Sequence, residues 1–424
     1  MALVLALVFA QGAPRQVTAR MTPAVGTSPR YVLVGSAPHA TTGTVFDCQV
    51  PGAPQPTCYG PQQIRNAYDV TPLLNRGDTG AGKTIVIIDA FQAPTIQSDL
   101  NAFDQTFGLP SPKLHIIAPF GLTPFDASNQ DQLGWSGEIS LDVQWAHAIA
   151  PGAAIDLVLS KSDSDQDILN ASRYAILHHL GDVISQSFGE GESCMEPSIM
   201  SQQHQLFELA TAEGVTIFAS SGDDGAAQPD CNSDGGLFLS ASTPASDPFV
   251  TGVGGTNLTA NLTTGAYQSE TAWNDGYGES GGGFSTVYSR PAWQTGASAG
   301  HARGVPDVAY NAGVDDGVLT YFSDGTPGVT SLYIFGGTSA GSPQWSGIIA
   351  DTDQLAHRDV GLINPALYLV YHTPAYGRAF HDVTTGNNTV SGVGGYNTGR
   401  GWDPVTGLGT PQANNLAQLL AFGD

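Results

Sequence analysis

The stretch TIVIIDAF, Thr84 to Phe91, is almost continuously apolar and rich in β-branched residues. A short run of this kind, without alternation of apolar and polar residues, predicts a parallel strand that is buried on both faces. Three later runs have the same character: AAIDLVLS at 153–160, DVISQSFG at 182–189 and GVTIFASSG at 214–222. We expect these four segments to lie in one parallel sheet.

Helical patterns separate and follow these strands. They are IQSDLNAFDQTFG at 96–108, SGEISLDVQWAHAIA at 136–150, DILNASRYAILHHL at 167–180 and MSQQHQLFELATAEG at 200–214. Strands that alternate with helices at this spacing predict an α/β fold, in which a parallel β-sheet is flanked by helices on both faces. The chain from about residue 250 onward is richer in glycine and turns.

The composition is that of a strongly acidic globular protein. The chain has 424 residues, with 38 acidic and 14 basic side chains, a formal net charge of −24 and a pI near 4.4. Such a surface repels nucleic acid and anionic membranes, so we expect neither as a partner. Because carboxylates lose their charge near pH 4, an acidic working environment would lower the self-repulsion of the fold. A generic acidic soluble protein explains the same numbers.

The N-terminus and the cysteines give information on the compartment in which the protein works. The start MALVLALVFAQGAPR resembles the end of a signal peptide without its positively charged beginning, so we expect a secreted protein. The four cysteines form no CxxC pair, which argues against a thiolate zinc site. Proximity favours the disulfides Cys48–Cys58 and Cys194–Cys231, although four cysteines allow three pairings.

The segment GDTGAGKT, at 77–84, matches the phosphate-loop pattern letter for letter. A phosphate loop follows a strand and opens a helix, whose N-terminus holds the phosphates. Here the glycines precede the strand at 84–91 instead. We therefore interpret this match as a turn and expect no nucleotide.

The segment FGGTSAGSP, at 335–343, presents one serine, Ser339, in a small glycine-rich turn before an apolar helical stretch. A serine hydroxyl becomes a nucleophile only beside a base, and the usual base is histidine. None of the ten histidines lies in such a setting. His147 follows an apolar face and is expected to pack inside, whereas His178 and His179 are expected on a helix surface.

Carboxylates offer an alternative base. Glu138 and Asp142 are four residues apart, so they share one face of the helix predicted at 136–150. Two acids at this spacing are either a solvated helix face or a pair that shares a proton, which raises one pKa and prepares a carboxylate for proton transfer. A third acid, Asp223, follows a predicted strand, at the sheet edge where ligands and catalytic groups collect.

Taken together, these motifs resemble the sedolisin family of serine-carboxyl peptidases, which have a subtilisin-like fold and act at acid pH. Four motifs occur in the order of the family: the E-x-x-x-D helix, SSGDDGA at 220–226, GGTSAGSP at 336–343, and the tail HDVTTGNN at 381–388 with GRGWDPVTGLGTP at 399–411. The resemblance covers the chain from about Cys58 to the C-terminus. It implies a peptidase catalytic domain at 58–424, preceded at 1–57 by a leader, a linker or the remnant of a short propeptide.

The resemblance assigns roles to the candidate residues. It implies that Glu138 is the general base for Ser339, that Asp142 orients Glu138, and that Asp223 completes the oxyanion hole. It implies that Asp89 is either a structural residue or a secondary residue of the site. Two glycine-containing segments resemble those that pair with an extended peptide, which makes substrate-binding candidates of Ser187, Phe188, Gly189, Gly281, Gly282 and Gly283.

The tail resembles the family's calcium loop and implies one structural Ca²⁺. Its ligands would be the side chains of Asp382 and Asp403 and the carbonyls of Val383, Gly399 and Gly401, which is the oxygen-rich set that calcium prefers. A turn with two solvated aspartates explains the same residues.

The expected function is a secreted endopeptidase that hydrolyses peptide bonds at acid pH through an acyl-enzyme, acting on peptides and proteins as a monomer. Two alternatives remain at this point. One is a tripeptidyl-peptidase with the same chemistry, and the other is an inactive relative that binds peptides.

Overall fold

The computed structural model describes residues 24–26, 29–36, 43–231, 236–324, 331–390 and 392–423. A central sheet has the strand order β13-β12-β8-β6-β3-β5-β4, and a further strand, β16, pairs with β12. Its strands are β3 (Thr84–Ala90), β4 (Lys113–Ile117), β5 (Ala154–Ser160), β6 (Val183–Gln186), β8 (Thr216–Ser220), β12 (Thr251–Ala260), β13 (Tyr267–Ala272) and β16 (Val308–Asn311). Every ladder of this sheet is parallel except that of β12 with β13. The four strands predicted from the sequence are β8, β6, β3 and β5, which are neighbours in space.

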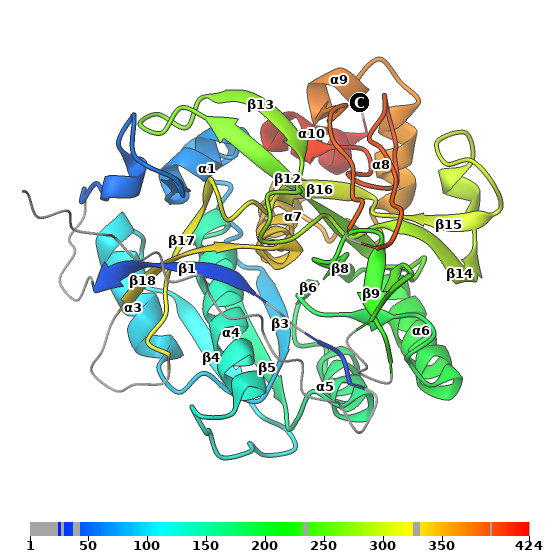
Figure 1. Ribbon diagram of the computed structural model, residues 1–424, viewed down its shortest axis with the longest axis horizontal. Coiled ribbons are helices and arrows are strands. Elements are labelled where there is room, and N and C mark those ends of the chain that lie inside the picture. Colours follow the sequence, from blue (N-terminus) through cyan, green and yellow to red (C-terminus); the bar gives the residue numbers. More distant parts are fainter. Residues whose placement is uncertain are drawn as a thin grey trace, which may run out of the picture.

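Helices cover both faces of this sheet, as predicted (Figure 1). The main ones are α3 (Ile96–Phe107), α4 (Gln130–Ile149), α5 (Asp165–Leu177), α6 (Pro197–Ala212) and α7 (Gly341–Ala356). Alternate residues of β3 separate two cores: Ile85 and Ile87 join the side chains of α3 and α4, whereas Val86 and Ile88 join those of α5 and α6. The helix predicted at 136–150 begins earlier, because the Asn129 side chain caps it by accepting hydrogen bonds from two backbone N–H groups.

A second, four-stranded sheet has the order β1-β18-β17-β2. Its strands are β1 (Arg30–Ser36), β18 (Ser331–Gly336), β17 (Gly317–Tyr321) and β2 (Cys58–Tyr59). Strand β1 comes from the segment that the sequence assigns to a leader or linker, and it pairs antiparallel with β18, from the far end of the chain. The expected export signal at 1–15 lies outside the described residues.

The remaining elements are helices, 3₁₀ turns and the strands of small two-stranded sheets. They are α1 (Pro61–Ala67), α2 (Thr71–Arg76), α8 (Asn364–Tyr371), α9 (Tyr376–Ala379), α10 (Ala413–Phe422), the 3₁₀ turns η1 (Asp47–Gln49), η2 (Ala292–Gln294) and η3 (Thr338–Ala340), and the strands β7 (Glu190–Gly191), β9 (Ala227–Pro229), β10 (Leu237–Leu239), β11 (Ser242–Thr243), β14 (Gly283–Ser289), β15 (Ala302–Val305), β19 (Phe380–His381) and β20 (Thr410–Pro411).

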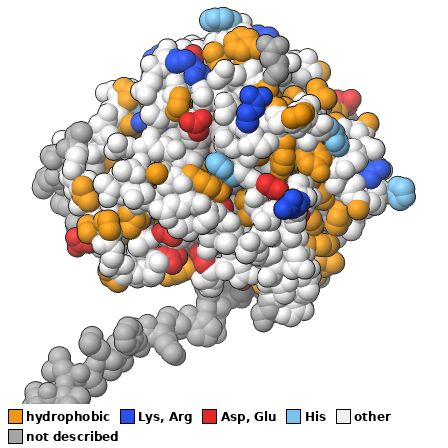
Figure 2. All heavy atoms as spheres, turned by 90° about the horizontal axis from the view of Figure 1, so that it is seen from above, with side chains coloured by type: hydrophobic (Ala, Val, Ile, Leu, Met, Phe, Trp, Pro, Cys, Tyr) orange, Lys and Arg blue, Asp and Glu red, His pale blue; other side chains and the backbone are white. Residues whose placement is uncertain are grey.

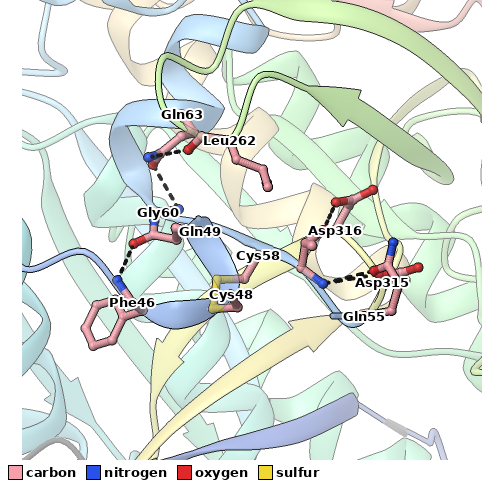
Figure 3. The surroundings of a disulfide bond; sticks show 11 residues. Phe46, Cys48, Gln49, Gln55, Cys58, Gly60, Gln63, Leu262, Asp315 and Asp316 are labelled. Carbon is pink, nitrogen blue, oxygen red and sulfur yellow. Dashed lines mark hydrogen bonds between the residues drawn. A yellow bond between two sulfur atoms is a disulfide. The ribbon is translucent and has the colours of Figure 1, made fainter. Parts of the chain in front are cut away.

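Both disulfides predicted from proximity are present, Cys48–Cys58 and Cys194–Cys231. Figure 3 shows the first, which ties the turn before β2 to the start of that strand. Beside it, the Gln63 side chain donates a hydrogen bond to the Leu262 carbonyl oxygen, at 3.2 Å. The disulfide thus anchors the segment that leads into the main domain.

The phosphate-loop match at 77–84 is a turn, as predicted. Helix α2 ends at Gly77, which has a left-handed φ of 93°, and strand β3 begins at Thr84. The lysine of the match, Lys83, forms ion pairs with Asp182 and Asp359. No helix N-terminus follows these glycines, so the segment has no phosphate cradle.

The surface carries few charges for its area. Figure 2 shows acidic and basic side chains scattered singly over one face, among uncharged polar groups and small apolar patches. Of the helices in the described ranges, none has the length and apolar character that crossing a membrane requires.

Candidate active site

Ser339 lies in the turn between β18 and α7. Gly337 makes this turn feasible, since its φ of 104° is left-handed and a Cβ there would lie 2.6 Å from a carboxylate oxygen of Asp223. Ser339 is 5% exposed, and its hydroxyl donates a hydrogen bond to the Ser187 carbonyl oxygen at 3.4 Å. The turn therefore holds the hydroxyl of Ser339 at the end of strand β6.

Glu138 and Asp142 lie on α4, and the side chains of both are fully buried. Helix α4 packs against the turn that carries Ser339. Burial rules out a solvated acidic helix face, which was one of the two explanations that the sequence left open. What remains is a pair of carboxyl groups inside the protein, where sharing protons is the way to avoid two buried charges.

The surroundings of Asp142 disfavour the charged form of its carboxyl group. Burial raises the pKa of Asp142 well above its usual value, and the neighbouring Asp89 raises it further. Hydrogen bonds from Ser187 and Glu138 act in the opposite direction on this pKa. The Ser187 hydroxyl donates to Asp142 Oδ1 at 2.9 Å.

Asp89 joins the same group of carboxyls. It lies near the end of β3, is fully buried, and has a pKa raised well above the usual value by burial and then by Glu138. Sequence analysis gave Asp89 only a structural or secondary place. The structure brings it together with Glu138 and Asp142, so this pocket holds three carboxyl groups.

Asp223 follows β8 and faces the Ser339 turn from the other side. Its Oδ1 accepts hydrogen bonds from the backbone N–H and the hydroxyl of Thr338, each at 2.8 Å. Burial raises the pKa of Asp223 to about 6, although Arg30 and the Thr338 bonds oppose the shift. The carboxyl group is therefore protonated at acid pH, next to the residue that precedes Ser339.

Arg30 is a residue that the sequence gave no role. Its guanidinium group forms an ion pair with Asp224 at 3.3 Å, and its charge lowers the pKa of both Asp223 and Asp224. The only signal for Arg30 in the sequence is the scarcity of basic residues, since the chain has 14 of them.

The candidate substrate segment Ser187–Gly189 is paired with an extended piece of the chain itself. Gly26 and Gly189 exchange two backbone hydrogen bonds, at 3.0 and 3.1 Å, in an antiparallel bridge. The neighbouring Val25 is fully buried, and Phe188 lies against Trp135 with ring centroids 5.9 Å apart. The backbone of Gly189 is thus paired with the segment of the same chain that carries Gly26.

The second candidate segment, Gly281–Gly283, runs into β14. A Cβ at Gly281 would lie 2.0 Å from the Ser221 carbonyl oxygen, and one at Gly282 would lie 2.3 Å from that of Pro404. These two glycines are required by neighbouring backbone. The segment also approaches Asp223, because the Gly281 N–H donates to the Gly222 carbonyl oxygen at 2.7 Å.

The candidate calcium loop brings Asp382 and Asp403 to one turn. The Gly401 N–H donates to Asp382 Oδ1 at 3.1 Å, and the Gly399 N–H donates to Asp403 Oδ2 at 2.9 Å. In the part of the chain that the structure describes, neither carboxylate has a Lys, Arg or His within ion-pair distance. The same residues contain no cluster of three acidic, His or Cys side chains that would hold a metal. Two carboxylates without a cation fit calcium, and the rest of the ligands would be carbonyl oxygens such as that of Val383.

Among the described residues, no histidine has a hydrogen bond or ion pair to Ser339, Asp142 or Asp223. His147 is fully buried, as predicted, and its Nε2 donates to the Pro110 carbonyl oxygen at 2.9 Å. His178 is exposed at the end of α5 and stacks on Tyr174. The Ser339 turn is thus buried beside carboxyl groups, where the central parallel strands β6 and β8 end.

Comparisons with known proteins identify the family of this chain. The model of the Subtilase family matches residues 129–366. The chain is 34% identical to kumamolisin from Bacillus sp. (strain MN-32), over 86% of this chain and 64% of that protein. It is 31% identical to sedolisin from Pseudomonas sp. (strain 101), over 93% of this chain and 71% of that protein.

A solved structure, Pseudomonas sedolisin (serine-carboxyl proteinase) with two molecules of pseudo-iodotyrostatin, superimposes with a TM-score of 0.76 at 28% identity. The superposition covers 88% of this chain and 100% of the sedolisin chain. The tripeptidyl-peptidase sed4 of Aspergillus fumigatus is 27% identical over 76% of this chain and 60% of that protein. The chain thus spans 60% to 71% of the length of these three curated relatives. It belongs to the sedolisin family of serine-carboxyl peptidases.

Proposed function

We propose that this protein is an endopeptidase that cleaves peptides and proteins at acid pH through an acyl-enzyme on Ser339. The observation that carries the proposal is the burial of Glu138 and Asp142 on the helix that packs against the Ser339 turn. Two carboxyl groups buried together can share a proton, and such a pair is suited to proton transfer.

In this mechanism Glu138 accepts the proton of the Ser339 hydroxyl as its oxygen attacks the scissile carbonyl carbon. The proton then passes from Glu138 to the leaving amine, which departs and leaves an ester on Ser339. Water, deprotonated by Glu138, attacks the ester, and the carboxylic acid product leaves with Ser339 restored. Asp142 holds Glu138 in position and shares its proton.

Asp223, protonated below its pKa of about 6, would donate a hydrogen bond to the oxygen that becomes negative during attack. Activity at acid pH then depends on the protonation states of two different groups. Asp223 must keep its proton, and the base that accepts the Ser339 proton must have lost its own.

The substrate would pair with the edge at Ser187–Gly189 in place of Gly26, which occupies the backbone groups of Gly189 in this structure. Backbone pairing recognises an extended peptide with little regard to most side chains. Gly281, Gly282 and Gly283 would lie on the opposite side of the same groove.

A tripeptidyl-peptidase is the second candidate, because sed4 of Aspergillus fumigatus carries that name. An inactive peptide-binding relative is the third. Intact residue types at Ser339, Glu138, Asp142 and Asp223 favour an active enzyme over it.

The proposal includes secretion, a monomeric state, a catalytic domain at 58–424, and one structural Ca²⁺. For the ion, the supporting observation is that Asp382 and Asp403 accept hydrogen bonds from the N–H groups of Gly401 and Gly399, while neither carboxylate has an ion pair with a Lys, Arg or His in the described part of the chain. Calcium would add positive charge to this loop and tie its ends together.

The test is the pH–activity profile of the purified protein on a denatured protein substrate, with Glu138→Gln and the exposed control Glu208→Gln. We expect a maximum below about pH 5 that is lost only in Glu138→Gln. A maximum near pH 8 that survives this substitution would exclude Glu138 as the base. Analysis of the products separates internal cleavage from release of tripeptides.

A further inference from the structure

Glu192 is a buried carboxylate that the proposed mechanism does not use. It directly follows β7, and its side chain is 2% exposed. Its Oε1 accepts a hydrogen bond from the Ser285 hydroxyl at 2.5 Å. Its Oε2 accepts one from the Thr286 N–H at 2.6 Å and another from the Thr286 hydroxyl at 2.9 Å.

These bonds join two segments that are far apart in sequence. Glu192 belongs to the segment that begins at Ser187 and carries Gly189, the residue that pairs with Gly26. Ser285 and Thr286 belong to β14, which continues directly from the glycines at 281–283. The carboxylate of Glu192 therefore lies between the two segments that form the proposed peptide groove.

Strand β14 needs this support because it leaves its own ladder here. Its register with β15 shifts between Phe284 and Ser289, so the intervening residues have no regular strand partner there. The Thr286 N–H bonds to Glu192 instead, and the Val287 and Tyr288 N–H groups bond to the Ser285 hydroxyl oxygen. Glu192 thus supplies a hydrogen-bond acceptor to β14 where the pairing of β14 with β15 is interrupted by the register shift.

On its other side, the segment that carries Glu192 is held by β11. Gly191 and Glu190 pair with Ser242 and Thr243 in a two-residue ladder. Glu192 thus adds a second attachment, from its side chain, to a segment with only a short ladder of its own.

We propose that Glu192 is a positioning residue that fixes the spacing between the two sides of the peptide groove, and so holds the edge at Gly189 ready for an extended peptide. This inference rests on the proposed function, because it gives the groove its role. The chemistry requires a carboxylate, since both oxygens accept hydrogen bonds. A glutamine has one acceptor oxygen, and its NH₂ group would face donors that it cannot satisfy.

The experiment uses the N-terminal segment of the chain as its own probe. Amide hydrogen exchange is measured on the full chain carrying Ser339→Ala, which prevents self-cleavage, with and without Glu192→Gln. The matched control is Glu196→Gln, an exposed residue four positions later whose side chain makes no capping bond to α6.

Local opening speeds exchange only where protection is lost. We expect Glu192→Gln to speed exchange about tenfold at Thr286 and also at Val25 and Gly26, whose N–H groups bond to Asp163 and Gly189. Glu196→Gln should change neither. Faster exchange at Thr286 with full protection at Val25 and Gly26 would overturn the proposal, and so would uniformly faster exchange over the whole chain.

A second readout separates this inference from the proposed function. In the chain with Ser339 intact, Glu192→Gln should leave the rate of labelling by a small fluorophosphonate within about twofold, because the reagent needs the reacting groups and not the groove. Absence of labelling in the parent chain would count against the proposed nucleophile, while the exchange result would still decide the role of Glu192. A loss of labelling in Glu192→Gln alone would mean that Glu192 supports the reacting groups, contrary to the proposal.

Discussion

Ser187 contacts both Asp142 and Ser339. Its hydroxyl donates a hydrogen bond to Asp142 Oδ1 at 2.9 Å, and its carbonyl oxygen accepts one from the Ser339 hydroxyl at 3.4 Å. The Ser187 hydroxyl also lies 3.3 Å from the Ser339 carbonyl oxygen. Sequence analysis treated Ser187 as a substrate-binding residue through its backbone, and it did not foresee this side-chain link between the acid pair and the serine turn.

Ser187→Ala should lower kcat about tenfold or more, because Asp142 loses the donor that fixes its carboxyl group and lowers its pKa. Ser185→Ala is the matched control, since it removes a buried hydroxyl from the same strand, whose partner is the Ser342 hydroxyl at 2.8 Å. Both variants should lose similar stability in urea unfolding. Equal kcat values for the two variants would remove Ser187 from the site.

Ser339→Ala should abolish peptide cleavage, with a loss of at least about 10⁴-fold, while the thermal midpoint changes little. The change deletes one oxygen whose hydrogen bond to the Ser187 carbonyl oxygen is long, at 3.4 Å, so the fold has little to lose. Cleavage assays and circular dichroism on the same preparation check this. Residual activity near that of the parent chain would show that another group is the nucleophile.

Stability should rise as the pH falls from 7 toward 4.5. Burial raises the pKa of Glu270, Asp104 and Asp353 to about 7 each, against values near 4 in an unfolded chain. Between these values the folded protein holds protons that the unfolded chain has released, so the free energy of unfolding falls as the pH increases. His147 and His381, with pKa values lowered to about 4, oppose this trend below pH 6.5 but are fewer.

The measurement is the thermal midpoint at pH 5 and pH 7, where we expect a difference of about 5 °C or more in favour of pH 5. Glu270→Gln removes one of these titrations and keeps the side-chain shape beside the Tyr68 hydroxyl. This variant should show a smaller difference between the two pH values. A midpoint that increases from pH 5 to pH 7 would contradict the prediction.

Removal of calcium should lower the thermal midpoint of the parent chain, because the negative charges of Asp382 and Asp403 would then share one turn without compensation. Asp382→Asn should abolish the response to added Ca²⁺. Asp403 is less suitable for this test, since its Oδ1 also accepts bonds from the Val405 and Thr406 N–H groups. Identical midpoints of the parent chain with calcium and with chelator would exclude the ion.

Local patterns in the sequence were sufficient for the framework of this protein. The apolar runs gave the four central strands, and the spacing of Glu138 and Asp142 put both on one helix, as α4 shows. The turn at Ser339 could also be predicted from neighbouring residues, because small residues are required where the backbone passes close to a side chain. Even the two disulfides followed from proximity along the chain.

Local patterns could not choose between a solvated acidic face on α4 and a buried acid pair. That choice depends on what packs against the helix, and the structure answers it by burying both side chains. Nor did the sequence place Asp89 beside Glu138, since the two belong to different elements that meet only when α4 packs on the sheet.

The sequence by itself predicted four central strands and the helices between them, because hydrophobic periodicity acts over a few neighbouring residues, and its motifs named the candidate site residues. Only the tertiary structure decided which of these residues meet. The pairing of Gly26 with Gly189 and the bond from Thr286 to Glu192 both join residues far apart in the chain. Such contacts rest on backbone hydrogen bonds and buried carboxylates, which leave no periodic trace in the sequence.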